Sequence, residues 1–142
     1  MNIVHSNSTQ DTIQIVYSLL PLIIKRKIIC FTGDLGSGKT FMCQQIVRNL
    51  LNDQDAIITS PTFPLLKTYQ SNEHGLIYHY DLYRAKSLIE LEEIGFLDTI
   101  NRASNICLIE WPQIAKHFIE VGLFLDISIM HIAQDSRQIH WI

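Results

Sequence analysis

Charged residues make up only 18% of the 142-residue sequence, and no hydrophobic run is long enough to span a bilayer. The most apolar stretch, residues 19–24, is too short for a transmembrane helix and contains Pro21. The first residues have neither the basic start nor the apolar middle of a signal peptide. The formal net charge of -3 argues against a large basic surface for gripping nucleic acid. We therefore expect a soluble, cytoplasmic protein without membrane contact.

Cysteine is scarce, and the three residues form no C-x-x-C pair. Cys30, Cys43 and Cys107 are far apart in the sequence, which fits neither zinc-ligand spacing nor a disulfide framework. We interpret all three as reduced thiols in a core. The six histidines likewise show no metal-ligand spacing. Repeats and low-complexity tracts are also missing, and 47% hydrophobic residues suffice for a single domain over residues 1–142.

A glycine-rich segment at residues 33–40 reads GDLGSGKT and fills every fixed position of the pattern G-x-x-x-x-G-K-[ST]. An apolar, β-rich run precedes it at residues 27–32, and residues 41–51 follow with apolar positions at helical spacing. In such a strand–loop–helix unit, backbone N–H groups surround a phosphate and the positive end of the helix dipole faces it. The sequence therefore predicts a nucleoside-triphosphate site.

Four side chains are candidates for the chemistry of this site. Lys39 is expected to reach the β- and γ-phosphates, and the Thr40 hydroxyl to bind Mg²⁺. Magnesium usually needs a carboxylate at a strand end as well, and both Asp81 and Glu110 end apolar runs. Glu110 follows the more apolar run, so we favour it as the metal ligand, with Asp81 acting through water or positioning the attacking water. Periodicity alone does not separate these two roles.

Three further features lie near the predicted site. Residues 60–63 read SPTF where phosphate-loop proteins keep a first switch, although a rigid turn is the commoner role of such a segment. Trp111 could stack on a nucleotide or a partner, or pack in a core. Among the histidines, His79 is the candidate for a part in the site because it stands two residues before Asp81, although a surface or core position is the commoner role.

Alternation of apolar runs and helical spacing predicts an α/β fold with a mixed, mostly parallel central sheet flanked by helices. The expected strands are residues 2–5, 27–32, 65–69, 76–82, 105–110, 123–132 and 138–142. A first helix begins at Ser8 or Thr9 and is expected to end or bend at Pro21. Further helices are expected at residues 41–51, 88–94 and 113–120.

Five motifs follow one another along the chain: GDLGSGKT at 33–40, SPTF at 60–63, YHYDLYR at 78–84, ELEEIGFLD at 90–98 and IEWP at 109–112. This ordered set resembles the bacterial TsaE (formerly YjeE) family of small P-loop ATPases, which are needed for threonylcarbamoyladenosine modification of tRNA. The resemblance implies a P-loop NTPase fold with ATP or ADP and Mg²⁺ as cofactors. It also implies a TsaB–TsaD-type complex as partner, which modifies adenosine 37 of tRNAs that read ANN codons. ATP hydrolysis would reset that complex between turnovers, so tRNA would be contacted only indirectly.

The resemblance also assigns roles to matching positions. It implies a nucleotide site made of Thr9, Gly33, Gly36, Ser37, Gly38, Lys39, Thr40, Phe41, Trp111 and Arg137. Metal binding falls to Thr40 and Glu110, and catalysis to Lys39, Asp81 and Glu110.

The chain departs from the family pattern at four positions. Ser37 replaces a usual Ala, which a loop acting through its backbone tolerates. Phe41 replaces a usual Thr or Ser and so removes a hydroxyl that could touch the α-phosphate. Pro64 stands where Thr is common and would stiffen the presumed switch. Arg137 lacks its usual preceding Gly, which leaves its nucleotide contact open.

Two other classes of function compete with an accessory ATPase. A small-molecule kinase would pass the γ-phosphate to a metabolite, but generally needs an Arg-rich lid that excludes water. After Glu110 the only basic side chains are Lys116 and Arg137. A nucleotide-gated binding module would couple ATP and partner binding without turnover. The guanine signature Asn-Lys-x-Asp is missing, which favours ATP over GTP.

Overall fold

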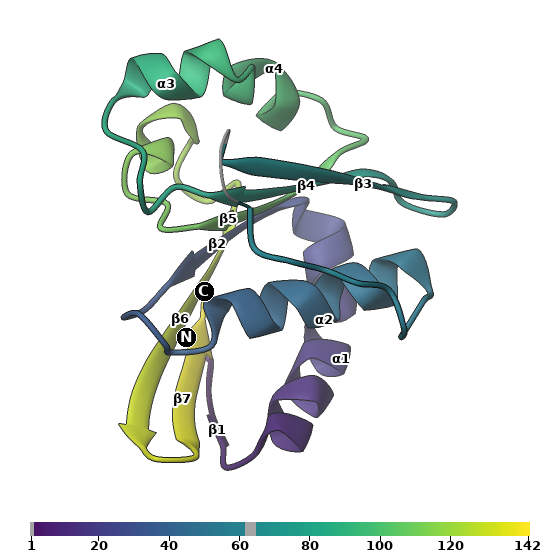
Figure 1. The fold of residues 1–142 in the computed structure, drawn as a ribbon, viewed down its shortest axis with the longest axis vertical. Coiled ribbons are helices and arrows are strands. Elements are labelled where there is room, and N and C mark those ends of the chain that lie inside the picture. The colour runs from purple at the N-terminus through teal and green to yellow at the C-terminus, as the bar shows by residue number, and fades with distance from the viewer. Residues whose placement is uncertain (1, 62–64) are drawn as a thin grey trace.

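One seven-stranded sheet organises residues 2–61 and 65–142, the part of the chain described by the computed structural model (Figure 1). The strands, in chain order, are β1 (Asn2–Ser6), β2 (Ile28–Thr32), β3 (Leu66–Ser71), β4 (Gly75–Asp81), β5 (Ile106–Glu110), β6 (Leu125–Ala133) and β7 (Ser136–Trp141). The helices are α1 (Thr9–Arg26), α2 (Lys39–Leu51), α3 (Leu88–Glu93), α4 (Phe96–Ile100) and the 3₁₀ helix η1 (Ala115–Phe118).

The strand directions confirm a mixed, mostly parallel sheet. The order across it is β1-β7-β6-β2-β5-β4-β3. The four central strands β6, β2, β5 and β4 are mutually parallel, whereas β7 and β3 pair antiparallel with their neighbours. Because β1 is antiparallel to β7, it runs in the same direction as the central strands. The strands expected at residues 65–69 and 76–82 correspond to β3 and β4, which form an antiparallel hairpin.

Successive side chains of the central strands point to opposite faces of the sheet and pack into two hydrophobic clusters, one on each face. In β2, Ile29 and Phe31 pack into the cluster that α1 and α2 cover, while Cys30 packs into the cluster beneath α3, α4 and η1 (Figure 1). All five positions of β5 are buried. Burial on both faces explains why β2 and β5 read as near-continuous apolar runs.

Helix α1 begins as expected but does not end at Pro21. Ser8 caps the helix by accepting a hydrogen bond from the backbone N–H of Asp11, and the helix continues through Pro21 to Arg26. Proline inside a helix costs about 3 kcal/mol. Leu19 and Ile23, on either side of Pro21, are both buried in the core. Burial of such side chains contributes about 1.5–3 kcal/mol each, which offsets the cost.

The helix expected at residues 113–120 is wrong in extent. Only η1 forms there, with backbone bonds from His117 to Ile114 and from Ile119 to Lys116. A segment this short is not stable as an isolated helix, so the packing of its apolar side chains decides its form. Helix α4 was not expected, although it lies within the ELEEIGFLD motif.

Within the described residues, no helix combines the length and apolar character needed to cross a membrane. Residues 62–64 lie outside the described residues, so the switch predicted at 60–63 and the effect predicted for Pro64 stay predictions.

Candidate functional site

The glycine-rich loop connects β2 to α2 and owes its path to its glycines. Gly33, Gly36 and Gly38 have φ angles of 147°, 76° and 112°, which glycine adopts without a steric cost. Gly33 is also pressed against β6. A Cβ at this position would collide with the backbone carbonyl oxygen of Ile129 and lie 2.7 Å from the Ser37 hydroxyl oxygen. The loop therefore needs glycine at its base both for conformation and for space.

The N-terminus of α2 is directed into the loop. The helix begins at Lys39, and Met42 donates the first backbone bond to the Gly38 carbonyl. N–H groups in the first turn of a helix have no acceptor within that helix. Together with the positive end of the helix dipole, they form a site that favours an anion such as a phosphate.

The Lys39 side chain folds back over the loop. Its Nζ donates to the carbonyl oxygens of Gly33 at 2.6 Å and Asp34 at 2.8 Å, and lies 4.3 Å from the centre of the Trp111 ring. Only 4% of Lys39 is exposed. Burial lowers the pKa of Lys39, and the negative charges of Glu110 and Asp81 oppose that shift. A phosphate bound in the loop would supply a further negative charge that stabilises the charged form of Lys39.

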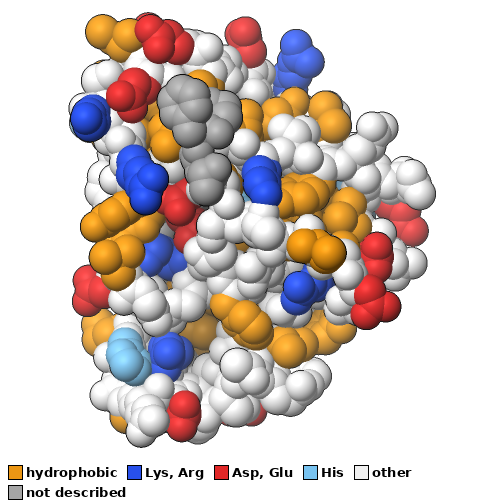
Figure 2. Space-filling model, viewed as in Figure 1, with side chains coloured by type: hydrophobic (Ala, Val, Ile, Leu, Met, Phe, Trp, Pro, Cys, Tyr) orange, Lys and Arg blue, Asp and Glu red, His pale blue; other side chains and the backbone are white. Residues whose placement is uncertain are grey.

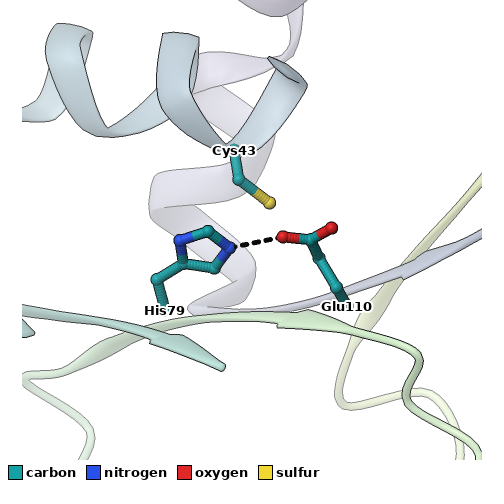
Figure 3. A group of neighbouring side chains, drawn as sticks. All are labelled: Cys43, His79 and Glu110. Atoms are coloured by element: carbon teal, nitrogen blue, oxygen red, sulfur yellow. Dashed lines mark hydrogen bonds and ion pairs between the residues drawn. The ribbon is translucent and has the colours of Figure 1, made fainter. Parts of the chain in front are cut away.

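Glu110 connects the loop helix to the sheet. It ends β5 with 1% of its surface exposed, and its Oε1 accepts a hydrogen bond from the Thr40 hydroxyl at 2.8 Å. Its Oε2 lies 2.6 Å from Nε2 of His79, a buried residue of β4 (Figure 3). Both carboxylate oxygens thus have partners, as a buried carboxylate requires.

Asp81 stands beside Glu110 at the same sheet edge. The parallel register of β4 and β5 pairs these two residues. Its Oδ1 accepts a hydrogen bond from the backbone N–H of Tyr83 at 3.1 Å. Burial raises the pKa of Asp81, and the Glu110 charge adds to this rise, while the Tyr83 hydrogen bond opposes it.

Two adjoining pockets meet at Gly38 and Phe41. The smaller, of about 240 Å³, is lined by Leu35, Gly36, Gly38, Lys39, Thr40, Phe41, Asp81, Tyr83, Glu110 and Trp111. The larger, of about 560 Å³, is lined by Ser6, Asn7, Ser8, Thr9, Thr12, Ser37, Gly38, Phe41, Met42, Ile129, Asp135, Arg137 and Ile139. Arg137 also donates from Nε to the Ser37 carbonyl at 3.0 Å. Apart from Gly33, at the base of the loop, every site residue expected from the sequence lines one of these pockets.

His79 was singled out in the sequence because it stands near Asp81, with a surface or core position preferred. It is fully buried, as a core position requires. Its contact with Glu110 was not expected. One signal was available, because side chains two positions apart on a strand point to the same face. His79 therefore shares a face with Asp81, and the parallel neighbour β5 brings Glu110 to that face.

The family model described as "Threonylcarbamoyl adenosine biosynthesis protein TsaE" matches residues 6–139. The chain belongs to the TsaE family. A TsaE protein of Rickettsia conorii is 42% identical over 131 residues, which cover 92% of this chain and 72% of that protein. One from Haemophilus influenzae is 39% identical over 127 residues, covering 87% of this chain and 75% of that protein. Both relatives are named tRNA threonylcarbamoyladenosine biosynthesis protein TsaE.

TsaE proteins are involved in the biosynthesis of threonylcarbamoyladenosine in tRNA. The match spans both pockets, from Ser6 to Ile139. The resemblance noted from five short motifs is thereby confirmed as family membership.

Proposed function

We propose that this TsaE protein is a Mg²⁺-dependent ATPase and an accessory component of the machinery that makes threonylcarbamoyladenosine in tRNA. The observation that carries the proposal is the contact between Thr40 and Glu110. It places a loop hydroxyl 2.8 Å from a buried carboxylate oxygen at the N-terminus of α2. Phosphate-loop proteins hold Mg²⁺ between such a hydroxyl and a strand-end carboxylate.

The donor set suits magnesium better than a softer metal. Thr40, Glu110 and Asp81 supply only oxygen atoms to the smaller pocket. Magnesium is usually held by one or two carboxylates together with waters and substrate phosphates, and this pocket has two. We assign Thr40 and Glu110 as the residues that hold the ion. When bound, the ion neutralises charge that develops on the β- and γ-phosphates.

The side chains around the phosphates then divide the work of hydrolysis. Lys39 leaves the carbonyls of Gly33 and Asp34 to meet the β- and γ-phosphates, and its charge stabilises the transferred group. Asp81 orients the attacking water. A raised pKa makes its carboxylate a better proton acceptor than an ordinary aspartate.

The larger pocket suits the nucleoside. It adjoins the loop at Gly38 and Phe41 and has room for a base and a ribose at about 560 Å³. Thr9 and Arg137, on opposite ends of the chain, both line it. We assign the adenine to this pocket, and ATP or ADP as its ligand.

The partner in this proposal is a TsaB–TsaD-type complex, which ATP hydrolysis resets between turnovers. The proposed contact with tRNA is indirect, through that complex. Basic and acidic side chains are interspersed over the face seen in Figure 2, and the net charge is -3. Neither observation suits a protein that grips tRNA by itself. We place the protein in the cytoplasm, where tRNA is modified.

Steady-state ATP hydrolysis, measured with the protein alone and with the TsaB–TsaD pair added, tests this proposal. We expect weak magnesium-dependent turnover alone, and a rise or coupling to tRNA modification with the pair. Nucleotide binding without any response to the pair would contradict the accessory role and favour a small-molecule kinase.

The Glu110→Ala variant tests the metal assignment. We expect kcat to fall about 100-fold or more, since a metal ion contributes several kcal/mol and each 1.36 kcal/mol is tenfold in rate. Metal-free nucleotide binding should persist. Glu73→Ala, on the exposed β3–β4 turn, is the matched control and should leave kcat unchanged. Retained magnesium-dependent turnover in Glu110→Ala would indicate that Asp81, not Glu110, binds the metal ion.

A further inference from the structure

The contact between His79 and Glu110 is unusual because both side chains are withdrawn from solvent. Their side chains are 0% and 2% exposed, and His79 Nε2 lies 2.6 Å from Glu110 Oε2. The other oxygen of the same carboxylate accepts the Thr40 hydroxyl. Histidine and threonine thus hold the carboxylate from opposite sides, one from β4 and one from α2.

The fold explains why these groups meet. His79 and Asp81 alternate onto one face of β4, and the register of β4 with β5 sets Glu110 beside Asp81. Helix α2 covers this face and contributes Cys43, which points toward the pair (Figure 3). The histidine is therefore held by packing and has no path to solvent.

A metal shared by Cys43, His79 and Glu110 is an alternative reading of the cluster, since their ligand atoms lie within 4.8 Å of one another. The distance between two of these groups opposes it. The 2.6 Å separation of His79 Nε2 and Glu110 Oε2 is hydrogen-bond length. Two ligands of one zinc ion, at bonds of about 2.0–2.2 Å, lie roughly 3.3 Å apart.

The second nitrogen of His79 indicates which way the hydrogen bond runs. Nδ1 is buried and has no hydrogen-bond partner among the described residues. A proton on Nδ1 would be a buried donor without an acceptor, which is costly. A proton on Nε2 instead donates to the carboxylate. The imidazole is therefore assigned with a hydrogen on Nε2, facing Glu110.

We propose that His79 is a positioning residue that fixes the Glu110 carboxylate, so that Oε1 stays turned toward Thr40 and the magnesium position. The proposal rests on the function proposed above. Without His79, Glu110 could rotate about its side-chain bonds, and the buried Oε2 would lose its donor. Partners of this kind, one step behind a metal ligand, typically contribute 10–100-fold to metal affinity or activity.

The test is a Mg²⁺ titration of nucleotide binding, followed by the fluorescence of a mant-labelled ADP. For His79→Leu we expect the apparent Mg²⁺ affinity to fall about tenfold or more. Affinity for mant-ADP in EDTA should stay within about twofold of the wild type, because the phosphate loop is untouched. His79→Gln retains an N–H near the position of Nε2 and should recover most of the Mg²⁺ affinity.

A matched control lies on the same hairpin. His74 Nε2 is 3.9 Å from Glu73, and the Glu73 side chain is 79% exposed, so His74→Leu breaks a histidine–glutamate pair of the surface. It should not change Mg²⁺ affinity. If His79→Leu lowers only the melting temperature and leaves Mg²⁺ affinity unchanged, His79 is structural and the proposal fails. If His79→Leu does not fold, equal Mg²⁺ affinity of His79→Gln and a His79→Asn variant, whose shorter amide falls short of Glu110, overturns it.

A measurement on the metal-free protein separates this inference from the proposed ATPase. In protein labelled with ¹⁵N-histidine, we expect the His79 signal to carry its proton on Nε2. An Nε2 without a proton would overturn the inference whatever the protein hydrolyses. Wild-type protein that binds no nucleotide would overturn the proposed function, and the role of His79 in holding magnesium would fall with it.

Discussion

At the scale of single residues, the site depends on carboxylates placed where water is scarce. Glu110 satisfies both of its oxygens through Thr40 and His79. Asp81 accepts one backbone hydrogen bond from Tyr83 and is only partly buried. The two acids therefore occupy different environments although the sheet register places them side by side. That difference supports the separate roles proposed for them, which their positions in the sequence did not separate.

Asp81→Asn should change stability in a pH-dependent way. Burial raises the pKa of Asp81 above its usual 3.8, so the folded protein holds the proton more tightly than the unfolded chain. The stabilisation that results from the tighter proton binding is fully present below the pKa of Asp81 in the unfolded chain. It is lost as the pH rises through the pKa of Asp81 in the folded protein. Asparagine is neutral throughout, so the variant should melt higher than wild type at neutral pH. The difference should be about 1–3 °C, because solvent screens a half-exposed group.

Thermal melting followed by circular dichroism from about pH 3.5 to 8 checks this expectation. The gain in melting temperature should vanish at the acid end. Asp55→Asn, at an exposed position after α2, is the matched control and should show no such trend. A variant less stable than wild type at neutral pH would mean that attraction from Lys39 outweighs burial.

At the scale of elements, helices and strands with strong sequence patterns were predicted correctly, and those with weak patterns were not. The unit of β2, loop and α2 was predicted from GDLGSGKT and its flanks, because glycine positions, strand pattern and helix pattern all agree there. The more apolar run, which ends at Glu110, forms β5, and β5 lies further inside the sheet than β4, which ends at Asp81. The expectation that the first helix ends at Pro21 is wrong, because local propensity does not include the packing of Leu19 and Ile23. The alternative, a bend at Pro21, stays a prediction.

The part of the candidate site that could not be predicted depends on pairing between strands. Thr40, Asp81 and Glu110 were expected together, because Thr40 ends the glycine-rich motif and both acids end apolar runs. The contact of His79 with Glu110 is set by the register of β4 against β5, although the two residues are 31 positions apart in sequence. Single-sequence patterns do not report such a register. The same limit applies to the larger pocket, which joins residues near both ends of the chain.

Gly33→Ala tests the close fit between the loop and β6. The added Cβ would collide with the Ile129 carbonyl, a backbone atom that cannot swing away. Together with a φ of 147°, this should destabilise the protein by about 1–3 kcal/mol and weaken nucleotide binding. Gly122→Ala is the matched control, since φ is 93° there but no atom lies within 4 Å of the added carbon. Equal melting temperatures for the two variants would show that backbone strain, not contact with β6, governs Gly33.

At the scale of the whole molecule, one sheet separates two hydrophobic clusters, and each holds a tryptophan at its edge. Trp141 packs against the cluster under α1 and α2, and Trp111 against the cluster under α3, α4 and η1. These are the only two tryptophans in the sequence. Because β2 and β5 contribute side chains to both clusters, the clusters cannot separate without breaking the central strands. We therefore expect both to unfold in one transition.

Single-tryptophan variants make this expectation measurable. Trp141→Phe leaves Trp111 as reporter of one cluster, and Trp111→Phe leaves Trp141 as reporter of the other. Their fluorescence melting curves should each coincide with the far-ultraviolet circular dichroism of the same variant. ADP with Mg²⁺ at 100 times its Kd should stabilise Trp141→Phe by about 2.7 kcal/mol, a rise of roughly 9 °C in both signals. A shift in the Trp111 signal without a matching shift in circular dichroism would mean that nucleotide stabilises only the loop region, and that the two faces of the sheet are not one cooperative unit.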